Sequence, residues 1–245
     1  MTNAEAEARE QLALCARALN RLDLLNLSGH VSLRVPDSPN ILITPGGGLD
    51  KARLTGDDMV TIDPEGNRLA GQYPPPWETP IHTVIHAARP ELGAIGHLHA
   101  HWSTVWSVVD RPLEIVLNYA VLLGGTIPCY DDLLWITTPE LGAKLCEALG
   151  SAAAVLMRGH GITVVGNTLD EMFYNAITLE DNARILWEAS ALGRPKVVPP
   201  EQIPPMAAIQ QKVKVGRRAL QYYANLEAPK DAQRHEHNRL PGSKW

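Results

Sequence analysis

Two short apolar segments that each lead into histidine constrain the fold of this chain more than any other feature. Gly93-Ala94-Ile95-Gly96 leads into His97-Leu98-His99, and residues 153–157 lead into Arg158-Gly159-His160-Gly161. Because residues i and i+2 of a strand point to the same face, His97 and His99 are expected to present their imidazoles side by side. The glycines around His160 allow the backbone to approach closely. The pattern predicts two strand-like elements that bring three histidines together.

Three imidazoles with one open position are typical of a catalytic metal centre, since structural zinc sites are usually closed by four protein ligands. Neutral imidazole binds several divalent ions. We therefore predict one divalent metal ion per subunit (Zn, Mn, Fe or Co), held by His97, His99 and His160. The spacing alone is a weak signal. His235-Glu236-His237 repeats it among polar residues, and we interpret that copy as a solvated tail without a ligand role.

Strand-like and helical segments are mixed along the 245 residues. Early strands separated by Pro- and Gly-containing turns are typical of an antiparallel meander. The later strands are flanked by helices, the last two expected over 168–192 and 206–225. The expected fold class is α/β with a central mixed sheet. We expect residues 1–225 to form a single domain and residues 226–245 a polar C-terminal tail.

Composition excludes several classes of function. The net charge of −5 gives no electrostatic case for nucleic-acid binding. No apolar run approaches the length of a membrane span, so no membrane partner is expected. The first seven residues are polar and acidic, unlike a signal peptide. Three widely spaced cysteines, at 15, 129 and 146, fit a reducing compartment, and a cytoplasmic location is expected.

Further candidate residues surround the three histidines. Glu78 opens a helix that precedes the His97 strand, and packing of that helix against the strand would bring the carboxylate to the metal. His82 and His86 share one face of the helix, where one of them could orient Glu78 or a ligand. His101 would continue the face of His97 and His99 if the strand extends that far. Trp77 could line an aromatic pocket, although core packing is an alternative for any of the tryptophans.

The same residues occur in an order that resembles the class II aldolase/adducin family, from about residue 5 to residue 192. The matching segments are Ser28-Gly29-His30-Val31-Ser32, Ile43-Thr44-Pro45-Gly46, Asp58-Met59-Val60, Glu78 with His82, Arg89-Pro90-Glu91-Leu92, His97-Leu98-His99 and Gly159-His160-Gly161. The resemblance implies a three-layer α/β/α fold with a central, mostly antiparallel sheet. It also implies a homotetramer with active sites near the subunit interfaces.

The resemblance assigns roles to residues. The family's three metal ligands fall on His97, His99 and His160, and its catalytic glutamate, which ligates metal and then acts as acid or base, falls on Glu78. Tyr130 stands where the family sometimes contributes a tyrosine across the subunit interface.

Departures from the family's sugar-phosphate enzymes favour another branch. Those enzymes carry Gly-Asn-Ile-Ser where this chain has Gly29-His30-Val31-Ser32, and a serine-rich phosphate loop where it has Pro74-Pro75-Pro76-Trp77. A phosphate site needs N–H and hydroxyl donors, and proline removes a donor. The chain is closer to the family's decarboxylases, which remove CO2 from dihydroxyphthalate or hydroxymethylpyridine dicarboxylate.

We therefore predict a metal-dependent decarboxylase of a hydroxylated aromatic carboxylate, acting through an enolate- or phenolate-like intermediate beside the cation. Glu78, His30, His82 or His101 would supply or relay the proton, with Tyr130 as a further catalytic candidate. Arg34, His82 and Trp77 are the predicted substrate contacts, Arg34 because arginine binds carboxylates bidentately. Two alternatives stay open: an aldolase for a non-phosphorylated hydroxy-carbonyl compound, and an adducin-like interaction module without activity.

Overall fold

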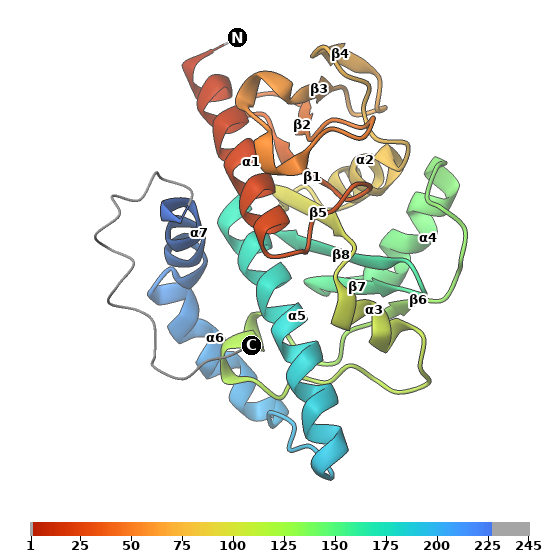
Figure 1. Ribbon diagram of the computed structural model, residues 1–245, viewed down its shortest axis with the longest axis vertical. Coiled ribbons are helices and arrows are strands. Elements are labelled where there is room, and N and C mark those ends of the chain that lie inside the picture. The colour runs from red at the N-terminus through yellow and green to blue at the C-terminus, as the bar shows by residue number, and fades with distance from the viewer. Residues whose placement is uncertain (1, 227–245) are drawn as a thin grey trace.

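A single eight-stranded sheet runs through the part of the chain that the computed structural model describes, residues 2–226 (Figure 1). Its strands are β1 (His30–Arg34), β2 (Ile41–Ile43), β3 (Val60–Ile62), β4 (Arg68–Ala70), β5 (Ala94–Leu98), β6 (Cys129–Tyr130), β7 (Ala154–Met157) and β8 (Gly161–Gly166). The spatial order is β4-β3-β2-β1-β5-β8-β7-β6. Every neighbouring pair is antiparallel except β6 and β7, which are parallel. The predicted mixed, mostly antiparallel sheet is confirmed.

Helices cover both faces of this sheet. They are α1 (Asn3–Arg21), α2 (Thr79–Ala88), α3 (His101–Ser107), α4 (Pro139–Leu149), α5 (Leu169–Leu192), α6 (Ile203–Lys212) and α7 (Val215–Asn225). Helices α1, α3 and α5 pack on one face and α2 and α4 on the other (Figure 1). Successive side chains of a strand point to opposite faces, so each face of the sheet has its own hydrophobic core. Ala94 and Leu98 of β5 pack in the core under α1 and α5, and Ile95 packs in the core under α2 and α4. The result is the expected α/β/α arrangement.

Helix α3 begins at the third residue after β5, and a side chain of another helix caps its N-terminus. Its own N-cap residue, Ala100, has no side chain that could accept a hydrogen bond. The Glu180 carboxylate of α5 instead accepts from the N–H groups of Trp102 (2.7 Å) and Ser103 (2.9 Å) and from the Ser103 hydroxyl (2.7 Å). Free N–H groups at a helix start favour such an anion. These three hydrogen bonds hold the turn that carries His99.

The C-terminal region differs from the sequence-based expectation. One helix was expected over 206–225, but α6 and α7 are separate, and Lys214 between them has φ 49° in the left-handed region. Apart from Leu226, the predicted tail over 226–245 lies outside the described residues. No helix within residues 2–226 is both long and apolar enough to span a bilayer.

Candidate metal centre

The centre of the sheet places histidines from two strands against helix α2. In the antiparallel pair of β1 and β5, His30 lies directly opposite His97, and Ser32 lies opposite Ile95. These four residues therefore point to the same face of the sheet. That face is covered by α2, whose residues His82 and His86 are one helical turn apart and both buried.

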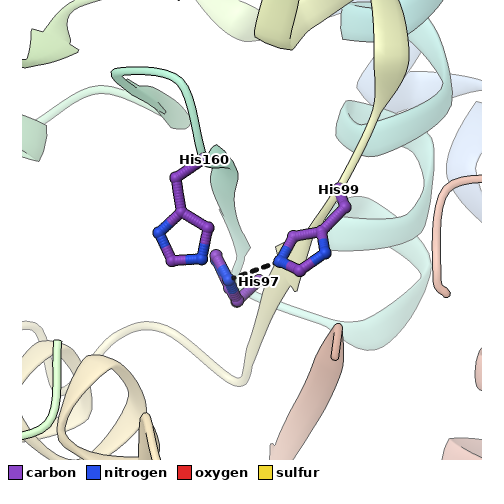
Figure 2. Close-up of side chains that lie close together, drawn as sticks. All are labelled: His97, His99 and His160. Atoms are coloured by element: carbon purple, nitrogen blue, oxygen red, sulfur yellow. Dashed lines mark hydrogen bonds between the residues drawn. The ribbon is translucent and has the colours of Figure 1, made fainter. Parts of the chain in front are cut away.

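His160 reaches the same place from the turn between β7 and β8. Gly159 in this turn has φ +62°, a conformation that glycine adopts without strain. A side chain at Gly161 would have its Cβ 2.3 Å from Leu98 O and 3.0 Å from the His99 ring, so only glycine allows β8 to start this close to the end of β5. In Figure 2 the rings of His97, His99 and His160 converge on one another, although they come from two separate parts of the chain.

Three distances between candidate ligand atoms suit a metal ion. His99 Nε2 lies 3.2 Å from His97 Nε2, and Glu78 Oε2 lies 3.6 Å from His97 Nε2 and 3.5 Å from His160 Nε2. Ligand atoms bound about 2.0 Å from a tetrahedral zinc ion lie roughly 3.3 Å apart. The three histidines and Glu78 could therefore hold a divalent ion with little movement.

The protonation states also suit a ligand set. His97 Nδ1 lies 3.1 Å from Ile162 O, a contact that requires the proton on Nδ1 and leaves the Nε2 lone pair free. Burial lowers the pKa of His97 to about 3, against a smaller opposing effect of Glu78, and burial also lowers the pKa of His99. Both imidazoles are thus neutral near pH 7, as metal binding requires.

Glu78 stands at the N-cap position of α2, but its side chain does not cap the helix. Instead Oε1 accepts a hydrogen bond from Ile136 N–H at 2.9 Å, which directs Oε2 toward His97 and His160. Burial raises the pKa of Glu78, but the contact with His160, the charge of His97 and the Ile136 N–H outweigh burial and bring the pKa to about 2. The carboxylate is ionised, buried and held in place.

A row of buried hydrogen bonds leads away from this cluster between β1 and α2. His30 Nδ1 lies 2.7 Å from His82 Nε2, His82 Nδ1 lies 2.7 Å from the Ser32 hydroxyl, and that hydroxyl lies 3.1 Å from His86 Nε2. The two outer atoms, His30 Nε2 and His86 Nδ1, are buried without a partner. With neutral imidazoles the row has two consistent proton arrangements, in which His30 Nε2 is either a donor or an acceptor. One ring nitrogen of His30 lies within 4.8 Å of ligand atoms of Glu78 and His97.

Two predicted site residues are not brought to the cluster. Arg34 was expected to bind substrate, but its Nε donates to Leu92 O at 2.8 Å and its Nη2 donates to His86 O, so the guanidinium joins β1 to the end of α2. His101 was expected to extend the strand face, but β5 ends at Leu98 and His101 starts α3. Its side chain is exposed and contacts the Trp102 ring edge-on, with centroids 4.9 Å apart.

Two aromatic candidates occupy different settings. Trp77 is 80% exposed directly before Glu78, and its ring centroid is 6.5 Å from that of Trp135. Tyr130 is buried in β6 with its hydroxyl 3.5 Å from Asp132 Oδ2. Burial and Asp132 raise the pKa of Tyr130, so its hydroxyl keeps its proton at neutral pH. A role for either residue in catalysis or binding stays a prediction.

Sequence reasoning missed two partners of the cluster. Ser32 joins His82 to His86, and strand alternation from His30 could have revealed that it shares their face. The Ile136 N–H that holds Glu78 comes from an irregular segment 58 residues away, and no sequence signal identifies it.

The comparisons with known proteins agree with this fold. The family described as "Class II Aldolase and Adducin N-terminal domain" matches residues 10–187. The chain therefore belongs to the class II aldolase and adducin family.

The named relatives of this chain include both aldolases and decarboxylases. The chain is 30% identical over 204 residues to a 5-methylthioribulose-1-phosphate/5-deoxyribulose-1-phosphate aldolase of Rhodospirillum rubrum, covering 83% of this chain and 90% of that protein. It is 26% identical over 201 residues to a 3,4-dihydroxyphthalate decarboxylase of Arthrobacter keyseri, covering 77% and 81%. An aldolase II superfamily protein from Pseudomonas syringae has the same fold, with a TM-score of 0.80 at 21% identity over 93% of this chain and 96% of that one. Aldolases and decarboxylases both break carbon–carbon bonds, so the family relationship supports a lyase.

Proposed function

We propose that this protein is a metal-dependent decarboxylase of a hydroxylated aromatic carboxylate, such as a dihydroxyphthalate. The observation that carries the proposal is the packing of two loops near Glu78, residues 44–48 and residues 74–77, the second of which begins with three prolines. Gly46 N–H donates to Pro74 O at 3.0 Å, and a Cβ at Gly46 would lie 2.9 Å from Pro75 O. The two loops therefore pack directly on each other.

The proline-containing loop offers few donors to a phosphate group. Residues 74–76 are prolines without N–H groups. The Thr44 hydroxyl accepts from Val31 N–H at 3.0 Å and is buried. A phosphate site depends on several converging N–H and O–H donors. The arrangement favours a substrate without phosphate, and an aromatic acid fits the exposed Trp77 and Trp135 rings at the same entrance.

The residues of the centre fit the proposed chemistry. A divalent ion bound by His97, His99, His160 and Glu78 would supply Lewis-acid polarisation of substrate oxygens. Glu78 is an ionised carboxylate in the cluster and can accept the proton of a substrate hydroxyl. His30 Nε2 has no partner in the protein, and His30 groups with Glu78 and His97, so His30 is the residue that would return a proton to the ring carbon. His82 holds the other nitrogen of His30 and orients the ring.

The proposal includes assembly and location. Exposed apolar side chains lie close to the centre, including Leu133 and Val108 beside Gly159 and the Trp77 and Trp135 pair. Such a surface supports a homotetramer with the site near a subunit interface, where Tyr130 of a neighbouring copy could contribute. The three cysteines are free, which supports a cytoplasmic location.

One experiment separates the proposal from its alternative. Purified protein reconstituted separately with Mn, Zn, Co and Fe is given a panel of ortho-hydroxy aromatic acids, and CO2 release is measured. The same preparations are given non-phosphorylated aldols, and aldehyde release is measured. CO2 release that requires metal is the expected result. Aldol cleavage without CO2 from any aromatic acid would overturn the proposal and favour the aldolase, which the relative from Rhodospirillum rubrum supports.

A further inference from the structure

Lys51 is a buried cation without a counter-ion. It is the first residue of a short 3-10 helix, η1 (Lys51–Arg53), and only 4% of the residue is exposed. Its Nζ donates to Pro45 O at 2.9 Å. The neighbouring carboxylate, Asp50, accepts from Ala52 N–H instead, and no carboxylate in residues 2–226 forms an ion pair with Lys51. Burial lowers the pKa of Lys51 to about 8.

An unpaired ammonium in such a place is costly, because a buried charge is normally paired or hydrogen-bonded at all its donors. An ammonium has three N–H donors. The Pro45 carbonyl takes one of them, and no other hydrogen bond from Lys51 is formed within the described part of the chain. Two donors are left for an acceptor from outside the protein.

The position of Lys51 relates it to the metal centre. Pro45 follows Thr44, whose hydroxyl binds Val31 N–H, and Val31 is the neighbour of His30 in β1. Lys51 is thus linked through Pro45 and Thr44 to the strand that carries His30, whose Nε2 is buried without a partner and which groups with Glu78 and His97.

We infer that Lys51 binds a second carboxylate of the substrate, the one that is retained in the reaction. The inference rests on the proposed function and narrows the substrate class to aromatic dicarboxylates. Two free N–H groups on one ammonium match the two oxygens of a carboxylate, whereas a phosphate dianion would need further donors. The adjacent loops provide fewer donors than such a site needs, because Gly46 N–H is bound to Pro74 O and residues 74–76 are prolines.

Binding of unreactive probes to the zinc-loaded protein tests this inference. Phthalate has two carboxylates and no hydroxyl, and benzoate has one carboxylate. Isothermal titration calorimetry should show phthalate binding about 10- to 100-fold more tightly than benzoate, the range that corresponds to a hydrogen bond with a charged group. In Lys51→Gln this preference should fall toward one. Glutamine can still donate to Pro45 O, so the variant removes the charge while it keeps the structural bond.

Controls separate binding from folding. Lys144→Gln, an exposed lysine of α4, should bind both probes as the wild type does. Lys51→Arg keeps the charge and should retain part of the preference. Thermal melting and zinc content of each variant report whether the fold and the metal centre are intact.

Three results would overturn the inference: an unchanged phthalate preference in a folded Lys51→Gln protein, no phthalate binding to the wild type, or Lys51-dependent binding of phenyl phosphate that is tighter than that of phthalate. The proposed function fails in a different way. Lys51-dependent phthalate binding without CO2 release from any hydroxylated aromatic acid would leave the carboxylate site intact and exclude the decarboxylase.

Discussion

His30 Nδ1 lies 2.7 Å from His82 Nε2, and both rings are buried between β1 and α2. Two neutral imidazoles at this distance share one proton, so the tautomer of one ring fixes that of the other. The pair also joins the strand that lies opposite His97 to the helix that starts after Glu78. The packing of α2 on the sheet and the geometry of the metal centre therefore depend on the same contact.

Ser32→Ala should destabilise the protein, because the Ser32 hydroxyl bridges His82 Nδ1 and His86 Nε2 in the buried row. Its removal leaves two buried ring nitrogens without a partner, at a cost of about 1–3 kcal/mol. The free energy of unfolding by urea at neutral pH measures the effect. Ser28→Ala, at an exposed position, is the matched control. Equal stability of the two variants would show that the row contributes nothing to folding.

Glu78→Gln should remove most of the activity while the fold is kept. Glutamine retains an oxygen for Ile136 N–H but is neutral and cannot accept a proton at neutral pH. The expected loss in kcat is about 10²- to 10⁴-fold, the usual contribution of general acid–base catalysis. Metal content measured beside kcat separates loss of the base from loss of the ion. A metal-replete variant with wild-type kcat would exclude Glu78 from proton transfer.

His160→Ala should weaken metal binding, because His160 Nε2 is one of the converging ligand atoms. Zinc at 100 times its dissociation constant stabilises a folded protein by about 2.7 kcal/mol. That increment, measured as the rise in unfolding free energy on addition of zinc, should be lost in the variant. His235→Ala changes the other His-x-His sequence and should respond to zinc as the wild type does. If zinc stabilised His160→Ala as much as it stabilises the wild type, His160 would not be a metal ligand.

Glu180→Gln should destabilise the turn between β5 and α3. The carboxylate accepts three hydrogen bonds at the start of α3, and an amide supplies one neutral acceptor oxygen in its place. A loss of about 1–3 kcal/mol in unfolding free energy is expected. Glu188→Gln on the exposed side of α5 is the control. Since His99 lies in this turn, weaker zinc binding should accompany the loss.

The sequence predicted those parts of the site that depend on regular geometry. Strand periodicity predicted that His97 and His99 lie together, and helical periodicity placed His82 and His86 on one side of α2. The order of the motifs also indicated the family and the mixed sheet. These features are local or repeat with a fixed period, so they can be read without coordinates.

The remaining features depend on contacts between distant segments. Whether β5 continues to His101 is decided by Glu180, 79 positions further along the chain, which starts α3 there. Whether Arg34 faces substrate is decided by the carbonyls of His86 and Leu92, which become available where α2 ends. The burial of Lys51 follows from how the loop after β2 folds back on Pro45. None of these outcomes has a periodic signal in the sequence.

The stability of the metal-free protein should fall as the pH falls from about 6.5 to about 3. Burial lowers the pKa of His86 to about 3, against about 6.5 in the unfolded chain. Within this window the unfolded state binds more protons, so the unfolding free energy decreases with decreasing pH by about 1.4 kcal/mol per pH unit for this residue. The lowered pKa values of His30, His82 and His97 act in the same direction.

The contribution of His86 to the pH dependence of the unfolding free energy can be measured separately. His86→Gln cannot titrate in this range, so its unfolding free energy should depend on pH less steeply than that of the wild type, by roughly one proton between pH 6 and pH 4. Urea unfolding of both proteins, freed of metal by a chelator, gives the two slopes. Since the His86 ring contacts the Ser32 hydroxyl and no metal ligand, the difference is independent of the metal centre. Equal slopes would mean that His86 is protonated in the folded protein or exposed to solvent there.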